Sequence, residues 1–300
     1  MVEIKTIFCG DENFPALLKE IPDTPEKIFV LGNEAILNND LKIAIVGTRK
    51  ASAVGRSLAR KFAKELAELG AVVVSGLAMG IDSAAHEGAL EAKCPPTSQA
   101  GGRQGKTIAV LANGLDKIYP AQNENLAKKI LEFNGAIISE YPEDTPSFPS
   151  QFLERNRIVS GLCAATIVIE APDRSGSLAT ARYAAEQGRE VFVVPGPAND
   201  INYIGSHKLI RDGAILITSV EDVIEDLGIE IFKVEESRKY LEIDDPQKQQ
   251  IINAIIESGQ PLDVDKISKL ANLEPQIVNQ LVAFLVIEGI LKETEKGYTL

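Results

Sequence analysis

Short apolar runs rich in β-branched residues recur through the middle of the chain. Each run is apolar at almost every position, which is typical of strands buried on both faces of a sheet. Segments with apolar residues at helical spacing separate several of the runs, and the clearest, Arg56–Leu69, ends at a glycine. We expect strands at residues 43–46, 72–75, 107–111, 136–139, 166–170, 191–194 and 214–218.

Strands that alternate with helices predict right-handed βαβ units and a mostly parallel sheet. Residues 42–228 are therefore expected to form a doubly wound, Rossmann-like α/β domain. Residues 1–41 are too few for a separate domain, so we expect a lead-in that packs on the sheet. An acidic linker is expected at 229–245. Three short helical patterns and a terminal hairpin in residues 246–300 predict a small winged-helix domain.

The charge is unevenly distributed along the chain, whose net value is −12. Residues 1–41 carry 3 basic and 8 acidic side chains, residues 42–220 carry 20 and 18, and residues 221–300 carry 8 and 17. A polyanionic ligand would therefore bind to the middle segment. The last predicted helix, at 275–287, has no Lys or Arg, so we expect the winged helix to contact protein or to be structural rather than to read DNA.

Several classes of protein are excluded by composition. No apolar run approaches the roughly 20 residues that span a bilayer, and the N-terminus lacks the basic and apolar regions of a secretory signal, so we expect a cytoplasmic protein without membrane contact. The cysteines, Cys9, Cys94 and Cys163, are widely spaced and odd in number, which predicts neither a disulfide framework nor a zinc site.

Glycines follow the expected strands where a doubly wound sheet binds its ligands, beyond the carboxyl ends of the strands. Gly47, Thr48 and Arg49 come after the first strand, Gly76 after the second, and Gly114 shortly after the third. Glycine lets backbone N–H groups approach a phosphate, and a guanidinium adds a planar, permanently charged clamp. The same glycines would also serve as ordinary turns, but their occurrence at one edge favours a ligand site.

Two further segments could bind an anionic ligand. Residues Arg174–Ser177 follow an expected strand and open a helix, where small hydroxyl residues and a glycine can cradle an anion or cap the helix. Residues Arg155–Arg157 place two arginines close together, with Phe148, Phe152, Tyr119 and Tyr141 nearby in sequence. This combination is either a solvated charge pair or a surface that stacks unpaired bases beside phosphate contacts.

Two other motifs are less informative. Residues 100–107 match a relaxed phosphate-loop pattern, yet a loop precedes them and a strand begins at Thr107, which is the reverse of the required order. No GxGxxG motif follows the first strand, so we expect no bound cofactor. Asp82 and His86 could act as an orienting acid and a base, but a structural pair at a helix start is the favoured interpretation. We therefore predict no catalytic residues.

Taken together, the motifs closely resemble one family, the DNA-processing protein A family (DprA, also called Smf). They occur in the family's order and cover nearly all of residues 42–218. The matching segments are IVGTR (45–49), SGLAMGIDSAAHEGAL (75–90), GKTIAVLANGLDKIYPAQNENL (105–126), GAIISE (135–140), FLERNRIVSGL (152–162), IEAPDRSGSLATARYAAEQGREVFVVPG (169–196) and GSHKLIRDGA (205–214). One departure from the family pattern is an insertion at 93–104.

The resemblance implies a non-enzymatic protein that binds and protects single-stranded DNA, dimerises and loads the RecA recombinase during natural transformation. It also implies that Arg49 is the chief phosphate contact and that Lys208 joins it. The alternative is a nucleotide-cleaving enzyme, because the domain also resembles the cytokinin-activating phosphoribohydrolases. Their catalytic glutamate position is occupied by Tyr183 here. The predicted DNA contacts are Gly47, Thr48, Arg49, Gly76, Gly114, Lys117, Arg155, Asn156, Arg157, Arg174, Ser175, Gly176, Ser177 and Lys208.

Overall fold

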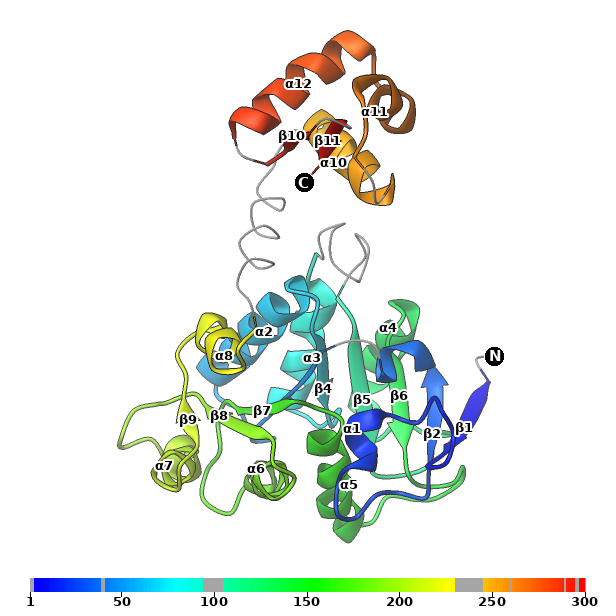
Figure 1. The fold of residues 1–300 in the computed structure, drawn as a ribbon. Helices are drawn as coiled ribbons and strands as arrows, with labels where there is room; N and C mark the ends of the chain where they lie inside the picture. The colour runs from blue at the N-terminus through cyan, green and yellow to red at the C-terminus, as the bar shows by residue number, and fades with distance from the viewer. Residues whose placement is uncertain are drawn as a thin grey trace. The chain divides into compact units, whose positions relative to one another are not determined.

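A nine-stranded sheet organises the first of two units in the computed structural model (Figure 1). Its strand order is β1-β2-β6-β5-β4-β3-β7-β8-β9, and the seven strands from β6 to β9 in this order run parallel. Every strand predicted from the sequence is present. The strands are β1 Ile4–Phe8, β2 Lys27–Gly32, β3 Lys42–Val46, β4 Val72–Ser75, β5 Thr107–Leu111, β6 Ala136–Ser139, β7 Ala165–Val168, β8 Glu190–Val193 and β9 Ile215–Leu216.

The structure describes residues 3–38, 41–93, 105–229, 245–258, 261–288, 290–294 and 297–299. These fall into two units, one within Met1–Cys94 and Gln104–Ile229 and the other within Glu230–Leu300. The predicted linker and the insertion lie almost wholly outside the described residues.

Helices cover both faces of the sheet, as the alternation of strands and helices predicts (Figure 1). The right-handed crossovers that run from β3 towards β6 place α2, α3 and α4 on one face. The chain then reverses direction across the sheet, which places α5, α6 and α7 on the other face. The helices of this unit are α1 Ala16–Lys19, η1 Glu34–Leu37, α2 Ala53–Glu68, α3 Ile81–Glu91, η2 Ala121–Asn123, α4 Glu124–Glu132, α5 Pro149–Gly161, α6 Gly176–Glu186, η3 Ile201–Tyr203, α7 Ile204–Arg211 and α8 Val220–Asp226.

The reversal of strand order lies between β3 and β7. From β3 the chain adds β4, β5 and β6 on one side, and it then returns to add β7 directly on the other side of β3. Loops that leave these two neighbouring strands turn to opposite faces of the sheet, which leaves a crevice at their carboxyl ends. All five residues of β3 and all four of β7 are buried, so the floor of this crevice belongs to the core.

The N-terminal segment does more than the sequence analysis expected. Side chains such as Phe14 and Leu37 pack in the core with residues of the sheet, and the segment also extends the sheet by two antiparallel strands, with β2 paired to β6 and β1 paired to β2. Partners such as Phe29 and Ser139 are far apart in sequence. Sequence patterns do not reveal such pairings, because they record local periodicity only.

The second unit contains the elements predicted for it, in the predicted order. Helices α10 Pro246–Ser258, α11 Val264–Ala271 and α12 Pro275–Ile287 are followed by an antiparallel hairpin, β10 Lys292–Thr294 and β11 Gly297–Thr299. Within the described residues, no single helix is long and apolar enough to cross a membrane. The pair α11 and α12, bent by 108°, passes that test together by length and composition. Both helices contribute buried side chains to the core of this unit.

Candidate functional site

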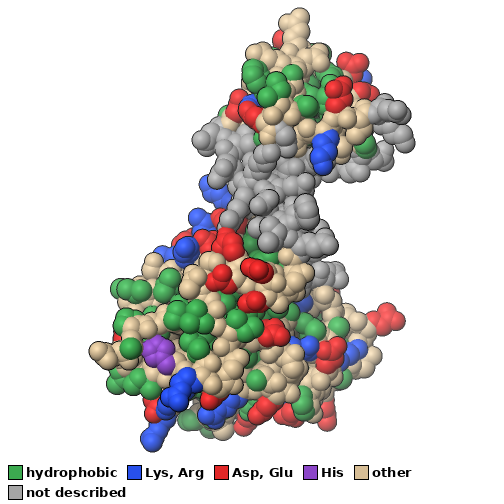
Figure 2. Space-filling model, turned by 60° about the vertical axis from the view of Figure 1, so that its left-hand side comes forward, with side chains coloured by type: hydrophobic (Ala, Val, Ile, Leu, Met, Phe, Trp, Pro, Cys, Tyr) green, Lys and Arg blue, Asp and Glu red, His purple; other side chains and the backbone are tan. Residues whose placement is uncertain are grey.

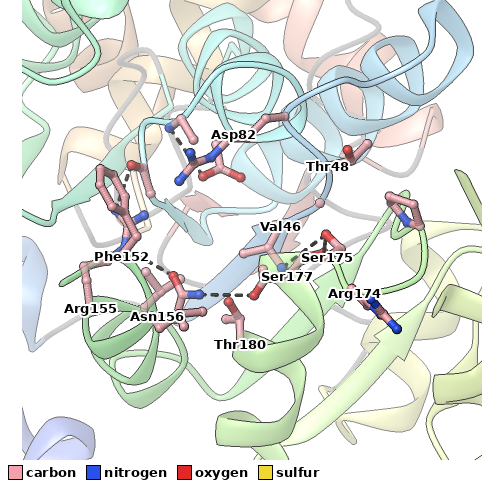
Figure 3. A pocket seen from close by; sticks show the side chains of 18 of the residues that line it. Val46, Thr48, Asp82, Phe152, Arg155, Asn156, Arg174, Ser175, Ser177 and Thr180 are labelled. Atoms are coloured by element: carbon pink, nitrogen blue, oxygen red, sulfur yellow. Dashed lines mark hydrogen bonds between the residues drawn. The ribbon is translucent and has the colours of Figure 1, made fainter. Parts of the chain in front are cut away.

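A pocket of about 550 Å³ opens at the crevice between β3 and β7. Its size lies in the ordinary range for small-ligand sites, and its walls come from the loops after β3, β4 and β7 and from one face of α5. Figure 3 shows side chains from these segments around one shared space. The predicted residues that line the pocket are Gly47, Thr48, Arg49, Gly76, Arg155, Asn156, Arg174, Ser175, Gly176 and Ser177.

The N-terminus of α6 forms one wall of the pocket. Ser175 caps this helix, because its hydroxyl accepts a hydrogen bond from Ser177 N at 3.4 Å and lies 2.7 Å from the Ser177 hydroxyl. A Cβ atom built at Gly176 would meet no atom within 4 Å, so the backbone there is open to a ligand. The first N–H groups of a helix lack intrahelical acceptors and carry partial positive charge. Capping and anion binding are therefore compatible at this wall.

Arg49 supplies a positive charge to the pocket. Its side chain is exposed, and the guanidinium carbon lies 4.8 Å from the centre of the Phe152 ring. Phe152 in turn contacts Tyr119, with ring centres 5.5 Å apart. In the part of the chain that the structure describes, no carboxylate forms an ion pair with Arg49. A cation and two aromatic rings thus face one pocket, but the cation is Arg49 rather than Arg155 or Arg157, with which the sequence analysis had grouped these aromatic residues.

The loop that carries Arg49 is held by Glu170, a residue that the sequence analysis missed. The Glu170 carboxylate is fully buried and accepts hydrogen bonds from the backbone N–H of Ser52, at 2.9 Å, and from the Ser52 hydroxyl. The Glu170 carbonyl accepts a further bond from Thr48 N at 2.8 Å. The Glu170 carboxylate occupies the position at the N-terminus of α2 where an anionic ligand would otherwise bind. The N-terminus of α6 is therefore the one of these two helix ends that is available to an anion. A glutamate at the end of an otherwise apolar strand was the signal, since buried carboxylates require partners.

Arg155 lines the pocket but is already engaged by the protein. Only 4% of the residue is exposed, and Nη1 donates to the carbonyl oxygens of Gly76, at 2.8 Å, and Val110. A Cβ atom at Gly76 would lie 2.5 Å from Arg155 Nη2, so only glycine allows this approach. Burial lowers the pKa of Arg155 to about 10, and the charge of nearby Asp82 opposes that shift. Burial raises the pKa of Asp82, against the effect of Arg155. Arg155 and Asp82 therefore form part of the buried structure that shapes the pocket.

The structure does not bring the remaining predicted contacts into this pocket. Arg157 forms ion pairs with Asp23 at 2.7 Å and with Glu140 at 2.6 Å. Residues two apart on a helix do not face the same side, which separates Arg157 from Arg155.

Gly114, Lys117 and Lys208 lie elsewhere as well. Gly114 packs against the Pro142 carbonyl and its N–H donates to Thr145 O at 2.9 Å, as expected of a turn glycine. Lys117 is exposed beyond the same turn. Lys208 pairs with Asp173 at 2.8 Å and lines a different groove.

His86 has a structural environment. Its Nδ1 lies 2.7 Å from Thr107 Oγ1, and that hydroxyl donates its own proton to Val73 O at 2.6 Å. Nδ1 must therefore carry the imidazole proton and donate it to Thr107. Burial, with a contribution from Arg155, lowers the pKa of His86 to about 3, so the ring is neutral. The favoured structural interpretation agrees with these contacts, but the partner of His86 is Thr107 rather than Asp82.

The fold and the site together define a doubly wound α/β protein with a pocket at its topological switch point. The family described as DNA recombination-mediator protein A matches residues 5–228. The chain belongs to this family, as its sequence motifs had indicated.

Relatives with sequence similarity bear the names expected for that family. Protein Smf of Escherichia coli strain K12 is 43% identical over 219 residues, which cover 73% of this chain and 55% of that protein. The chain thus spans about half the length of this relative. DNA processing protein DprA of Bacillus subtilis strain 168 is 41% identical over 224 residues, which cover 75% of this chain and 71% of that protein.

Solved structures agree with the fold. DNA processing protein A from Streptococcus pneumoniae has a TM-score of 0.67 and 40% identity, over 75% of this chain and 74% of that one. DNA processing protein A from Helicobacter pylori, described for its single-stranded DNA binding mode, has a TM-score of 0.65 and 33% identity. That match covers 75% of this chain and 96% of the other.

Proposed function

We propose that this chain binds single-stranded DNA in the pocket between β3 and β7. The observation that carries the proposal is Arg49, an exposed guanidinium without an ion pair among the described residues, which faces the same pocket as the open N-terminus of α6. Both groups recognise phosphate without reading sequence. The Helicobacter pylori relative, which binds single-stranded DNA, supports the proposal.

The aromatic side chains beside Arg49 suit an unpaired base. Phe152 and Tyr119 line the pocket, and about half of Tyr119 is exposed. A phosphate that draws the Arg49 guanidinium away from the Phe152 ring would free that ring for a base to stack on. Stacking on an aromatic ring contributes roughly 1–3 kcal/mol per base and tolerates any sequence. A duplex, whose bases are already stacked, would gain no such contact.

Membership of a recombination-mediator family supports a wider role, in which the protein protects incoming single strands and loads a RecA-type recombinase. A second observation favours binding over catalysis. The residue at the position of the phosphoribohydrolase glutamate is Tyr183, and Tyr183 does not line the pocket.

A homodimer is part of the proposal, with the β9 end of the sheet as its interface. Edge strand β9 has one unpaired side, and Leu216, Ile204 and Ile201 nearby are 48%, 39% and 69% exposed. Figure 2 shows hydrophobic side chains gathered around the histidine visible on this face. Leu216→Glu would place a charge on this surface, and light scattering should then give the monomer mass where the wild type gives twice that value. If Leu216→Glu has the same mass as wild type, β9 does not form the dimer interface.

The test of DNA binding is a fluorescence-anisotropy titration of a labelled single strand and of the matching duplex, at two salt concentrations. We expect preference for the single strand, weaker binding at high salt, and a loss of about 1–3 kcal/mol in Arg49→Ala. The control is Arg211→Ala, which removes the same charge from an exposed residue of α7 that does not line the pocket. Equal affinity of Arg49→Ala and wild type would refute the assignment of the pocket.

A further inference from the structure

A second groove, of about 750 Å³, lies between α6 and α7. It continues from the first pocket around the loop after β7, because Asp173, Arg174 and Ser175 line both. Apolar side chains from α6, α7 and the neighbouring strands contribute much of its surface: Leu178, Ala181, Ala185, Val191, Leu209 and Ala214. A flexible polymer that leaves the first pocket past Arg174 would enter this groove.

The basic side chains of the groove differ in whether they are already paired. Arg189 donates to Leu17 O and pairs with Glu20, and Lys208 pairs with Asp173. The groove also contains the carboxylates of Glu190 and Asp212, so it is not simply a basic surface.

The other two basic side chains, Arg174 and Arg182, are exposed, and neither forms an ion pair with any residue that the structure describes. The charge of Arg174 nevertheless joins that of Lys208 in lowering the pKa of Asp173. In a chain with a net charge of −12, unpaired arginines along one groove are a specific feature rather than a general excess of positive charge.

The two unpaired arginines follow one another along the groove. Arg174 immediately precedes the helix cap, and its side chain points away from Ser177 and Thr180 (Figure 3). Arg182 lies on the helix six residues after its first residue, which is about 9 Å along the axis at 1.5 Å per residue. Successive cations along an apolar groove match a polymer with repeated negative charges and flat apolar bases.

We propose that the groove between α6 and α7 is a second subsite for the same DNA strand, with Arg182 as a phosphate contact. This inference rests on the proposed function of the first pocket. It extends the binding site by a segment that a short oligonucleotide does not reach, and it accounts for the position of Lys208 outside the first pocket. An acidic peptide could also recognise unpaired arginines, but in that case Arg182→Ala would bind DNA strands of every length like wild type.

The test is a length series of labelled oligo-dT from about 4 to 16 nucleotides, the range that single-strand sites of one domain cover. Wild type, Arg49→Ala, Arg182→Ala and Arg182→Glu are titrated by anisotropy, with Arg211→Ala as the matched control. Arg211 lies on α7, is exposed and does not line the groove. Thermal melting and light scattering verify that each variant keeps its fold and its assembly state, as expected because Arg182 is exposed.

We expect Arg182→Ala to bind the shortest strands like wild type and to bind longer strands about three- to ten-fold more weakly. The slope of log affinity against log salt should fall by about 0.7 for the longer strands, as for one lost phosphate contact on a single strand. Arg182→Glu should show a larger loss, and Arg211→Ala none.

The outcomes are distinguishable. If Arg49→Ala binds weakly at every length while Arg182→Ala equals wild type, the second subsite is refuted and the first pocket stands. Equal losses in Arg182→Ala and Arg211→Ala would also refute the subsite, because they would reflect net charge alone. If wild type binds no strand of any length, the proposed function itself is wrong.

Discussion

Replacement of Arg155 by methionine would test whether this arginine supports the pocket or binds the ligand directly. Methionine keeps the long apolar stem but removes the guanidinium. The carbonyl oxygens of Gly76 and Val110 would then lose a donor, and the buried carboxylate of Asp82 would lose its nearby cation. These groups are buried, and methionine offers them no donor in return.

The magnitude follows from these losses. Each buried carbonyl left without a donor costs about 1–3 kcal/mol, and leaving the buried Asp82 carboxylate without a nearby compensating cation costs about 3–5 kcal/mol. The desolvation that lowers the pKa of Arg155 is relieved in the variant, which offsets part of the sum. We therefore expect a net loss of about 3–5 kcal/mol in the free energy of unfolding, or roughly 6–20 °C in Tm for a unit of this size.

Urea denaturation followed by circular dichroism would measure this loss. Because Arg155 lowers the pKa of Asp82, its removal should raise that pKa further, so the loss should be smaller at pH 5 than at pH 8. Adding Asp82→Asn should recover about 1–3 kcal/mol. A variant as stable as wild type that no longer binds single strands would refute this reasoning and make Arg155 a direct ligand.

Two further predictions concern the buried histidine and the open helix terminus. The pKa of His86 is about 3 in the folded protein, against an ordinary value of 6.5 that applies in the unfolded chain. At pH values between these two, the unfolded state therefore binds one more proton than the folded state. Stability should therefore fall as pH drops through this range, and the difference between wild type and His86→Leu in urea melts should change by about 1.4 kcal/mol per pH unit near pH 5. A stability difference between wild type and His86→Leu that stays the same at every pH would contradict this prediction. Gly176→Val should leave Tm within about 2 °C, because nothing lies near its Cβ, while single-strand affinity falls about ten-fold in anisotropy titrations. Unchanged affinity would show that no ligand approaches this part of the backbone.

The parallel part of the sheet could be predicted from the sequence because its strands are buried on both faces and therefore apolar throughout. Edge strand β1 lacks that signal, since its residues alternate irregularly between exposed and buried. The hydrogen bonds that bring β1 and β2 into the sheet depend on partners distant in sequence, including β6 for strand β2. No local pattern specifies that choice.

The site was predictable as far as it follows one rule, that ligands of parallel α/β sheets bind beyond the carboxyl ends of the strands. Gly47 to Arg49 and Arg174 to Ser177 follow neighbouring strands, and they meet as that rule requires. The different roles of the two arginines of α5 were harder to predict from the sequence. Arg155 and Arg157 look alike in the sequence, but the backbone carbonyls and carboxylates around each become apparent only in the folded chain. Their spacing of two residues was nevertheless a signal that they face different sides of the helix.

The pairing of β3 with β7 has a consequence for ligand discovery. The walls of the pocket come from segments separated by more than a hundred residues, brought together by partners such as Ile43 and Ala165. An unfolded chain therefore contains no trace of the site, and any ligand that enters it binds the native state alone. By mass action such a ligand adds about 2.7 kcal/mol to stability at a concentration of 100 times its Kd. The melting temperature of the sheet domain can thus reveal ligands without a prior assumption about their chemistry.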